Sequence, residues 1–171
     1  MGEILEHIEQ RRSIRRFTEE PLSRDQLESL VRAGMAAPSA TNRRPWQFVI
    51  VTEAEILQDL RGRLPLGRYK APAAIVVCGD LRHALPPPAR GFWVLDCSAA
   101  TENILLAAAG MGLGAVWIGV YPLRPLMRLV ARAVRLPRPV KPLAVVWVGH
   151  PAEVKPALNR FDASRVHWER F

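Results

Sequence analysis

The sequence predicts a single α+β domain in which helices flank a central sheet of mixed or antiparallel strands. Amphipathic segments with helix-capping residues follow short valine-rich segments in irregular order, which indicates helices and strands in mixed succession. A chain of 171 residues, 49% of them hydrophobic, is long enough to bury one full core. Internal repeats and long linkers are absent from the sequence, so nothing in it suggests a second domain.

Three helices are expected in the first third of the chain. Residues 4–8 carry the apolar face of a short first helix. The second helix starts at a capping box made by Ser23 and Gln26, in which each side chain bonds to the other residue's backbone. The same spacing recurs at Thr52 and Glu55, which predicts a capping box at the start of the third helix.

Short apolar segments rich in valine, isoleucine or alanine are expected to form strands, namely 47–51, 73–79, 115–120 and 143–148. Residues 92–111 are apolar on nearly every side, which predicts a helix at the centre of the molecule. A further helix begins near Pro125. The prolines within 85–89 and 137–142 predict loops, because proline lacks the backbone N–H of regular structure.

The segment from Arg11 to Phe17 contains four arginines and one serine. Guanidinium groups bind phosphate oxygens in pairs, and a hydroxyl can complete such a site. The segment therefore predicts a phosphate site, although a solvated basic surface or a nucleic-acid patch would have the same composition. Aromatic side chains that could stack on bases are limited to Phe17 and Trp46 in its vicinity, which disfavours nucleic acid.

The net charge of +8 indicates an anionic ligand or surface without identifying it. Cys78 and Cys97 lie in apolar segments without CxxC spacing, so we expect buried free thiols of a reducing compartment. The N-terminal residues lack the pattern of a signal peptide, and we therefore expect a cytoplasmic protein. Residues 104–121 are nearly long enough to span a membrane, but four glycines interrupt them, so no membrane span is expected.

Three common site motifs are not supported. The glycines within 110–114 follow a predicted helix and precede a strand, the reverse of the order in a dinucleotide-binding fingerprint, so we interpret them as a helix end and a turn. The four histidines are scattered and form no metal-binding motif with the cysteines. A GxSxG elbow typical of serine hydrolases is also absent from the sequence.

Several segments together resemble the nitroreductase family of FMN-dependent oxidoreductases. The resemblance extends in order over nearly the whole chain and is carried by Arg11-Arg12-Ser13-Ile14-Arg15-Arg16-Phe17, Ala37-Pro38-Ser39-Ala40-Thr41-Asn42, Pro45-Trp46, Asp96-Cys97-Ser98-Ala99-Ala100-Thr101-Glu102-Asn103, Gly112-Leu113-Gly114, Trp117-Ile118-Gly119, Arg160-Phe161 and Val166-His167-Trp168-Glu169-Arg170-Phe171.

The resemblance implies a nitroreductase-like α+β flavin fold built as an intertwined homodimer, with FMN sites at the subunit interface. It implies that the FMN phosphate and ribityl chain are held by Arg11, Arg12, Ser13 and Arg160, and that Arg15 approaches the flavin ring. It implies that a loop containing Pro38, Ser39, Ala40 and Asn42 reaches the flavin of the other subunit. It also implies that the strand residues Trp117, Ile118 and Gly119 line the flavin ring.

The implied activity is hydride transfer from NADH or NADPH, followed by reduction of a small acceptor such as a nitroaromatic or quinone in ping-pong fashion. The flavin supplies the redox chemistry, so no catalytic acid or base is expected. A flavin-binding or flavin-sequestering protein without turnover is the alternative. One departure from the family pattern is Arg44, where glutamine commonly precedes the Pro-Trp pair. The segment from Arg61 to Phe92 is also short, so any part of it that covers a substrate must be small.

Overall fold

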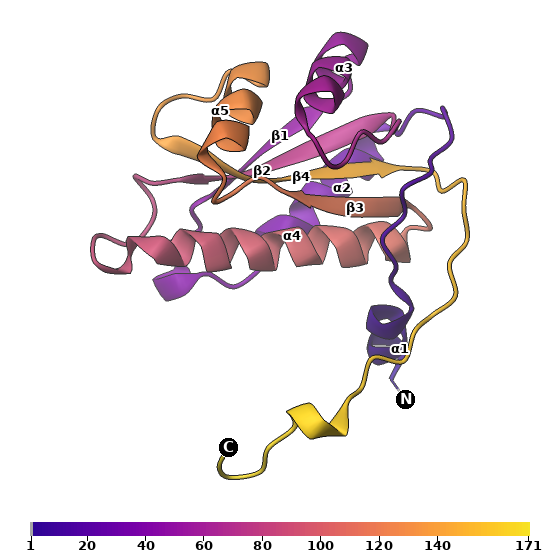
Figure 1. Ribbon diagram of the computed structural model, residues 1–171, viewed down its shortest axis with the longest axis vertical. Helices are drawn as coiled ribbons and strands as arrows, with labels where there is room; N and C mark the ends of the chain where they lie inside the picture. The colour runs from indigo at the N-terminus through magenta and orange to yellow at the C-terminus, as the bar shows by residue number, and fades with distance from the viewer. Residues whose placement is uncertain (1) are drawn as a thin grey trace.

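Four antiparallel strands form the centre of the computed structural model, which describes residues 2–171 (Figure 1). Their order is β1-β2-β4-β3, and all three strand pairs are antiparallel. The strands are β1 (Trp46–Val51), β2 (Ala73–Asp80), β3 (Gly114–Gly119) and β4 (Val140–Gly149). Every residue of β2 is buried, because this strand lies inside the sheet and is covered on both faces.

Helices cover both faces of the sheet (Figure 1). The helices are α1 (Glu3–Gln10), α2 (Arg24–Met35), α3 (Ala54–Arg63), α4 (Phe92–Gly110) and α5 (Arg124–Ala133). Side chains of α2 and α4 pack with Ile75 and Val146 on one face. Side chains of α3 and α5 pack with Val76 and Trp147 on the other. Alternate residues of β2 and β4 thus face two separate cores, and the fold is α+β as predicted.

Of the two capping boxes predicted from the sequence, the structure confirms one and contradicts the other. At α2 the capping box is confirmed, since Ser23 Oγ accepts the Gln26 N–H at 3.1 Å and Gln26 Oε1 accepts the Ser23 N–H at 2.8 Å. The capping box predicted for Thr52 and Glu55 was wrong. The chain remains extended through Glu53, which caps α3 without a side-chain hydrogen bond.

The sequence predicts a loop at Pro142, but this residue lies inside β4. The pairing of β2 with β4 shifts between Val77 and Cys78, opposite this residue. Such an irregularity accommodates a residue that cannot donate a backbone hydrogen bond. The expectation that proline lies in a loop therefore fails at Pro142, where the hydrogen-bonded pairing of β2 with β4 is irregular.

The sequence predicts α4 at the centre of the molecule, but the helix lies along one face of the sheet and is not covered on every side. Ile104 is fully buried, whereas Phe92 and Leu95 near its start are 46% and 62% exposed. The helix ends where the glycines predicted: Gly112 has φ +71° in the turn that leads into β3. An apolar strip of α4 thus faces away from the rest of the chain.

Helix α1 and the residues after Gly149 project from the sheet and its helices (Figure 1). Their apolar side chains are exposed, including Ile4 (76%), Trp168 (82%) and Phe171 (fully). Within residues 2–171, no helix combines the length and the apolar character needed to cross a lipid bilayer.

Candidate flavin site

Three of the predicted phosphate ligands line one cavity. Arg11 and Arg12 follow α1, and Arg160 belongs to the C-terminal extension, about 150 residues later in the chain. The cavity measures about 820 Å³ and is also lined by Ile8, Glu9, Glu102, Ala157, Leu158, Asn159 and Phe161. This size lies within the range of small-molecule and cofactor sites. The structure therefore brings Arg160 to the N-terminal arginines as the resemblance implied.

The guanidinium groups in this cavity are held in place. Arg11 forms an ion pair with Glu102 of α4 at 3.2 Å, and its side chain is only 19% exposed. Arg12 donates a hydrogen bond to the carbonyl oxygen of Pro156. Glu9 and Glu102 also line the cavity, so the three arginines exceed the carboxylates by one charge. The cavity is thus suited to a phosphate whose oxygens take paired hydrogen bonds from arginine.

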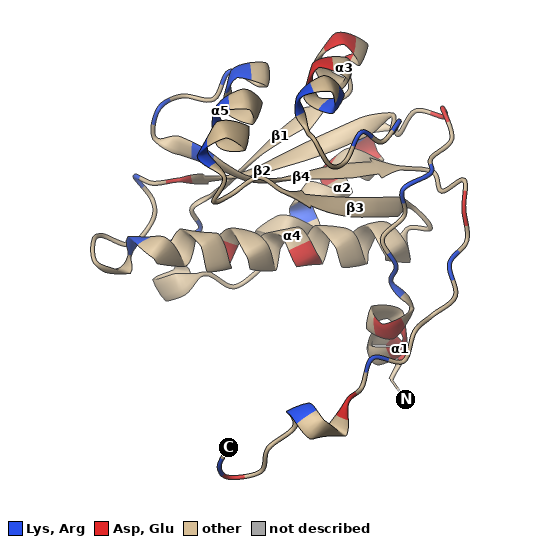
Figure 2. Ribbon diagram, in the orientation of Figure 1, with Lys and Arg blue, Asp and Glu red and all other residues tan. Residues whose placement is uncertain are grey.

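Ser13 and Arg15 continue the same segment beside the C-terminal extension. Lys155 Nζ donates to the Ser13 carbonyl oxygen at 2.7 Å. Glu153 Oε1 accepts the backbone N–H of Arg15 at 2.6 Å, and this bond lowers the Glu153 pKa below its ordinary value. Figure 2 shows basic residues on both neighbouring segments. The side chain of Arg16 is exposed to solvent.

Sequence reasoning missed Glu153 and Lys155. They form an ion pair with each other at 3.1 Å and bond to residues 137 to 142 positions earlier in the chain. Neither belongs to a recognisable motif, and a contact of such long range leaves no signal in local spacing. They fix the path of the basic segment where it passes the C-terminal extension.

The predicted ring-lining residues lie on β3 at the edge of the sheet. Ile14 of the basic segment donates its backbone N–H to the carbonyl oxygen of Ala115 at 3.0 Å. The backbone groups of Ala115 therefore point to the edge of β3 that faces away from β4. Strand alternation then directs the backbone N–H groups of Trp117 and Gly119 to the same edge. Trp117 and Ile118 are half-buried, whereas Gly119 is exposed. This edge can donate hydrogen bonds to a planar ligand beside it.

The loop of residues 38–44 is anchored on α4 by a buried carboxylate. Asp96, 5% exposed, accepts the Ala40 N–H at 2.8 Å. Three residues of the loop have left-handed backbone, with φ of 49° at Thr41, 56° at Asn42 and 49° at Arg44. Left-handed conformations are unfavourable for residues other than glycine, so neighbouring contacts must hold the loop. Asp96 belongs to a segment that resembles the family, but no pattern in the sequence indicates this anchoring role.

Within one chain, this loop and the arginine cavity occupy different sides of α4. Asp96 anchors the loop, and Glu102 contacts Arg11. Six residues separate them, about 9 Å along the helix axis and roughly 120° around it. The structure thus groups the arginines with the start of β3 but not with Pro38, Ser39, Ala40 and Asn42. Delivery of this loop to the flavin of a partner stays a prediction.

The two cysteine thiols and the side chains that could bind a metal form no further reactive site among residues 2–171. Cys78 and Cys97 are buried free thiols, and burial raises the pKa of Cys78 to about 12 and the pKa of Cys97 still further. Neither thiol is poised as a nucleophile. Among residues 2–171, no three His, Cys, Asp or Glu side chains gather as a metal site.

The chain is similar to known proteins in both sequence and fold. The sequence profile of the Nitroreductase family matches residues 8–64 and 67–150. A protein of Archaeoglobus fulgidus with the provisional name NADH dehydrogenase/NAD(P)H nitroreductase is 40% identical over the whole of both chains. A solved structure from Parabacteroides distasonis with the same provisional name is 40% identical, has a TM-score of 0.94 and is also matched over its full length.

A protein of Desulfovibrio desulfuricans with the provisional name nitroreductase was solved in complex with FMN. It is 28% identical, has a TM-score of 0.84, and the match covers 100% of this chain and 99% of that one. The family profile, the relatives matched over their full length and the shared fold lead to one conclusion: this chain belongs to the nitroreductase family.

Proposed function

We propose that this chain binds FMN beside β3, accepts hydride from NAD(P)H and passes electrons to a small acceptor such as a nitroaromatic or quinone. The observation that carries the proposal is the cavity lined by Arg11, Arg12 and Arg160, the last of which lies about 150 residues later in the chain. A phosphate group would accept paired hydrogen bonds from these guanidinium groups, whereas a flavin without phosphate offers them no anion. The family relationship, and the FMN bound to a relative of the same fold, support this choice of cofactor.

Each group of residues has a role in this proposal. Arg11, Arg12 and Arg160 hold the phosphate, and Glu102 keeps Arg11 oriented toward the cavity. The outward N–H groups of Trp117 and Gly119 bind polar atoms of the flavin ring. FMN, when bound, supplies the hydride acceptance and the electron transfer of the reaction. The protein contributes binding, orientation and charge, and we assign no catalytic acid or base.

We further propose that the active form is a homodimer. Ser39, Ala40 and Asn42 form a loop that is anchored on α4 away from the arginine cavity of the same chain. A second chain would allow this loop to complete its partner's flavin site. The exposed apolar strip of α4 and the apolar C-terminal extension provide surface for such an interface. The buried free thiols suit the reducing cytoplasm, which we propose as its location.

Steady-state kinetics test the proposed turnover. If NAD(P)H and the acceptor use one face of the flavin in turn, double-reciprocal plots at several acceptor concentrations give parallel lines. Intersecting lines would show that both substrates bind together and would contradict the shared site. If the protein holds FMN but neither NADH nor NADPH supports reduction of a nitroaromatic or quinone, the alternative of a flavin-binding protein without turnover would be supported.

A further inference from the structure

We propose that Glu153 and Lys155 form a polar clamp that holds the C-terminal extension (residues 150–171) against the basic segment (residues 11–17) and thereby positions Arg160 in the arginine cavity. Figure 1 shows the two segments side by side. Both members of the clamp are positioning residues, because they set the path of the chain and neither is among the residues that line the cavity. The inference rests on the proposed function, in which Arg160 binds the FMN phosphate.

The clamp bonds to both the donors and the acceptors of one short stretch of backbone. Oε1 of Glu153 accepts the backbone N–H of Arg15 at 2.6 Å and that of Arg16 at 3.3 Å. Lys155 Nζ donates to the Ser13 carbonyl oxygen at 2.7 Å and lies 3.1 Å from Glu153 Oε1. Hydrogen bonds with a charged partner are stronger than those between neutral groups. The two side chains thus hold the extension to the basic segment through charge-assisted bonds.

Burial within the extension is confined to these two side chains. Of residues 151–171, only Glu153 and Lys155 are half-buried, and every other residue is exposed. Val154 between them is 97% exposed, as expected where alternate residues of an extended segment face the same side. The extension therefore has no buried apolar side chain to attach it, and its position depends on the polar contacts of the clamp.

The clamp lies directly before the part of the extension that lines the cavity. Arg12 donates to the carbonyl oxygen of Pro156, and residues 157–161 then form one wall of the cavity. Beyond Pro156, the hydrogen bonds and ion pairs of the extension within residues 2–171 all join two of its own residues. The place of Arg160 thus depends on how residues 153–156 are attached. A wall that is held before FMN arrives lowers the cost of ordering it on binding.

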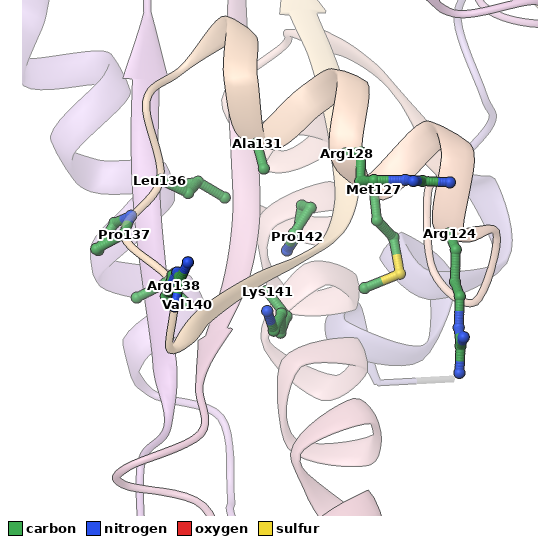
Figure 3. A pocket seen from close by; sticks show the side chains of 10 residues that line it. All are labelled: Arg124, Met127, Arg128, Ala131, Leu136, Pro137, Arg138, Val140, Lys141 and Pro142. Carbon is green, nitrogen blue, oxygen red and sulfur yellow. The ribbon is translucent and has the colours of Figure 1, made fainter.

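Fluorescence titration with FMN tests the clamp in the full-length protein after its bound flavin has been dialysed away. Lys155→Met removes the donor but leaves a long side chain, and should raise the FMN Kd by about tenfold or more, the loss expected for a charged hydrogen bond. Lys155→Arg retains a cation with N–H donors and should restore most of the affinity. The matched control Lys141→Met removes a half-buried lysine at the other end of β4, labelled in Figure 3, and should leave the Kd unchanged.

A double-mutant cycle shows whether Lys155 acts through Arg160. Arg160→Ala alone should also raise the FMN Kd by about tenfold. If the clamp positions Arg160, adding Lys155→Met to Arg160→Ala should change the Kd little further, because the two residues contribute as one unit. A combined loss of about a hundredfold would show two independent contributions and would overturn the inference.

Amide hydrogen exchange measured by NMR detects the clamp without flavin. Glu153→Ala should speed exchange of the Arg15 and Arg16 N–H groups, whereas Glu153→Gln retains the Oε1 acceptor and should keep most of their protection. Unchanged exchange in Glu153→Ala would show that no clamp holds the segment. If the wild type binds FMN and Lys155→Met binds it equally well, the inference is overturned while the proposed function stands. A wild type that binds no FMN would contradict the proposed function and this inference with it.

Discussion

Arg11 connects the arginine cavity to α4, and we expect phosphate binding to depend on it. Its guanidinium pairs with Glu102 and is largely enclosed, so it is oriented before a ligand arrives. Arg11→Ala should weaken FMN binding by about 1.5 to 3 kcal/mol, the range for a charged hydrogen bond. Fluorescence titration measures this loss.

Two controls make the Arg11 prediction specific. Arg16→Ala removes an exposed arginine of the same segment and should leave FMN affinity unchanged. Riboflavin lacks the phosphate, so its weaker affinity should be the same in the wild type and in Arg11→Ala. Equal losses of FMN and riboflavin affinity would show that Arg11 supports the segment's conformation and does not bind the phosphate.

Asp80 gives a pH-dependent test of stability. Its carboxylate is 2% exposed and accepts a hydrogen bond from the Arg82 guanidinium at 2.6 Å, which is the main reason that its pKa falls to about 2. The folded pKa lies below the ordinary value of 3.8, so the ionised form is favoured by folding. This stabilisation is complete above about pH 5 and is lost as pH falls toward 2.

We therefore expect Asp80→Asn to lower the free energy of unfolding by about 1 to 2 kcal/mol at pH 7, since the exposed Arg82 guanidinium is partly screened. Denaturant unfolding should show this difference shrinking below pH 4. Asp59→Asn, which removes an exposed ion pair with Arg63, serves as the control and should change stability by less than about 1 kcal/mol. A difference that stays constant down to pH 2 would contradict the assignment.

At the scale of single residues, the sequence could show candidate ligands but not their surroundings. Arg11 and Arg12 stand out because guanidinium groups in one short segment suit phosphate. Lys155 and Glu153 could not be found, because their contacts with Ser13 and Arg15 join the two ends of the chain. Their roles follow from the fold and not from local chemistry.

The loop of residues 38–44 depends on one helix residue for its conformation. Asp96→Ala removes the acceptor of the Ala40 N–H and leaves that donor unpaired. We expect a loss of about 1 to 3 kcal/mol in the free energy of unfolding and a smaller fraction of chains that retain FMN after gel filtration. Asp96→Asn retains an acceptor oxygen and should restore most of both.

The rescue distinguishes this anchoring role from a need for negative charge at position 96. If Asp96→Asn loses as much FMN as Asp96→Ala, the charge itself would be needed. If neither variant releases FMN, the loop would have no part in the flavin site.

Secondary structure was predictable where its signals are local. The Ser23–Gln26 capping box determines the start of α2 from residues within one turn. The same spacing at Thr52 and Glu55 failed because β1 continues to Val51 and the chain stays extended before α3. Pro142 failed for a related reason, since the pairing of β2 with β4 is irregular beside it. At Pro142 strand pairing, a long-range interaction, thus outweighed the local preference.

At the scale of the whole molecule, the exposed apolar residues show what a single chain leaves uncovered. Leu95 of α4 and Trp168 and Phe171 of the C-terminal extension are all exposed. Each large apolar side chain gains about 1.5 to 3 kcal/mol on burial. A partner chain could supply that cover, and the sequence could indicate it only through the family resemblance, because no pattern in one chain records its interface.

Deletion of residues 166–171 tests the proposed dimer. We expect a monomeric or poorly soluble protein with little bound flavin, as measured by light scattering together with visible absorbance. Two substitutions within the tail provide the matched pair: Trp168→Ser with Phe171→Ser should reproduce the loss, whereas Glu169→Ser with Arg170→Ser should not. A truncated monomer that retains one FMN per chain would show that the site is complete without a partner.

The most direct test of the central proposal is the visible absorption spectrum of the purified protein under anaerobic conditions. The proposed site predicts about one bound FMN per chain, bleached by NADH or NADPH and restored when a nitroaromatic or quinone is added. If the acceptor restores the full absorbance of the oxidised flavin, the acceptor has taken both electrons. A protein without flavin, or a bound flavin that neither nucleotide reduces, would contradict the proposal.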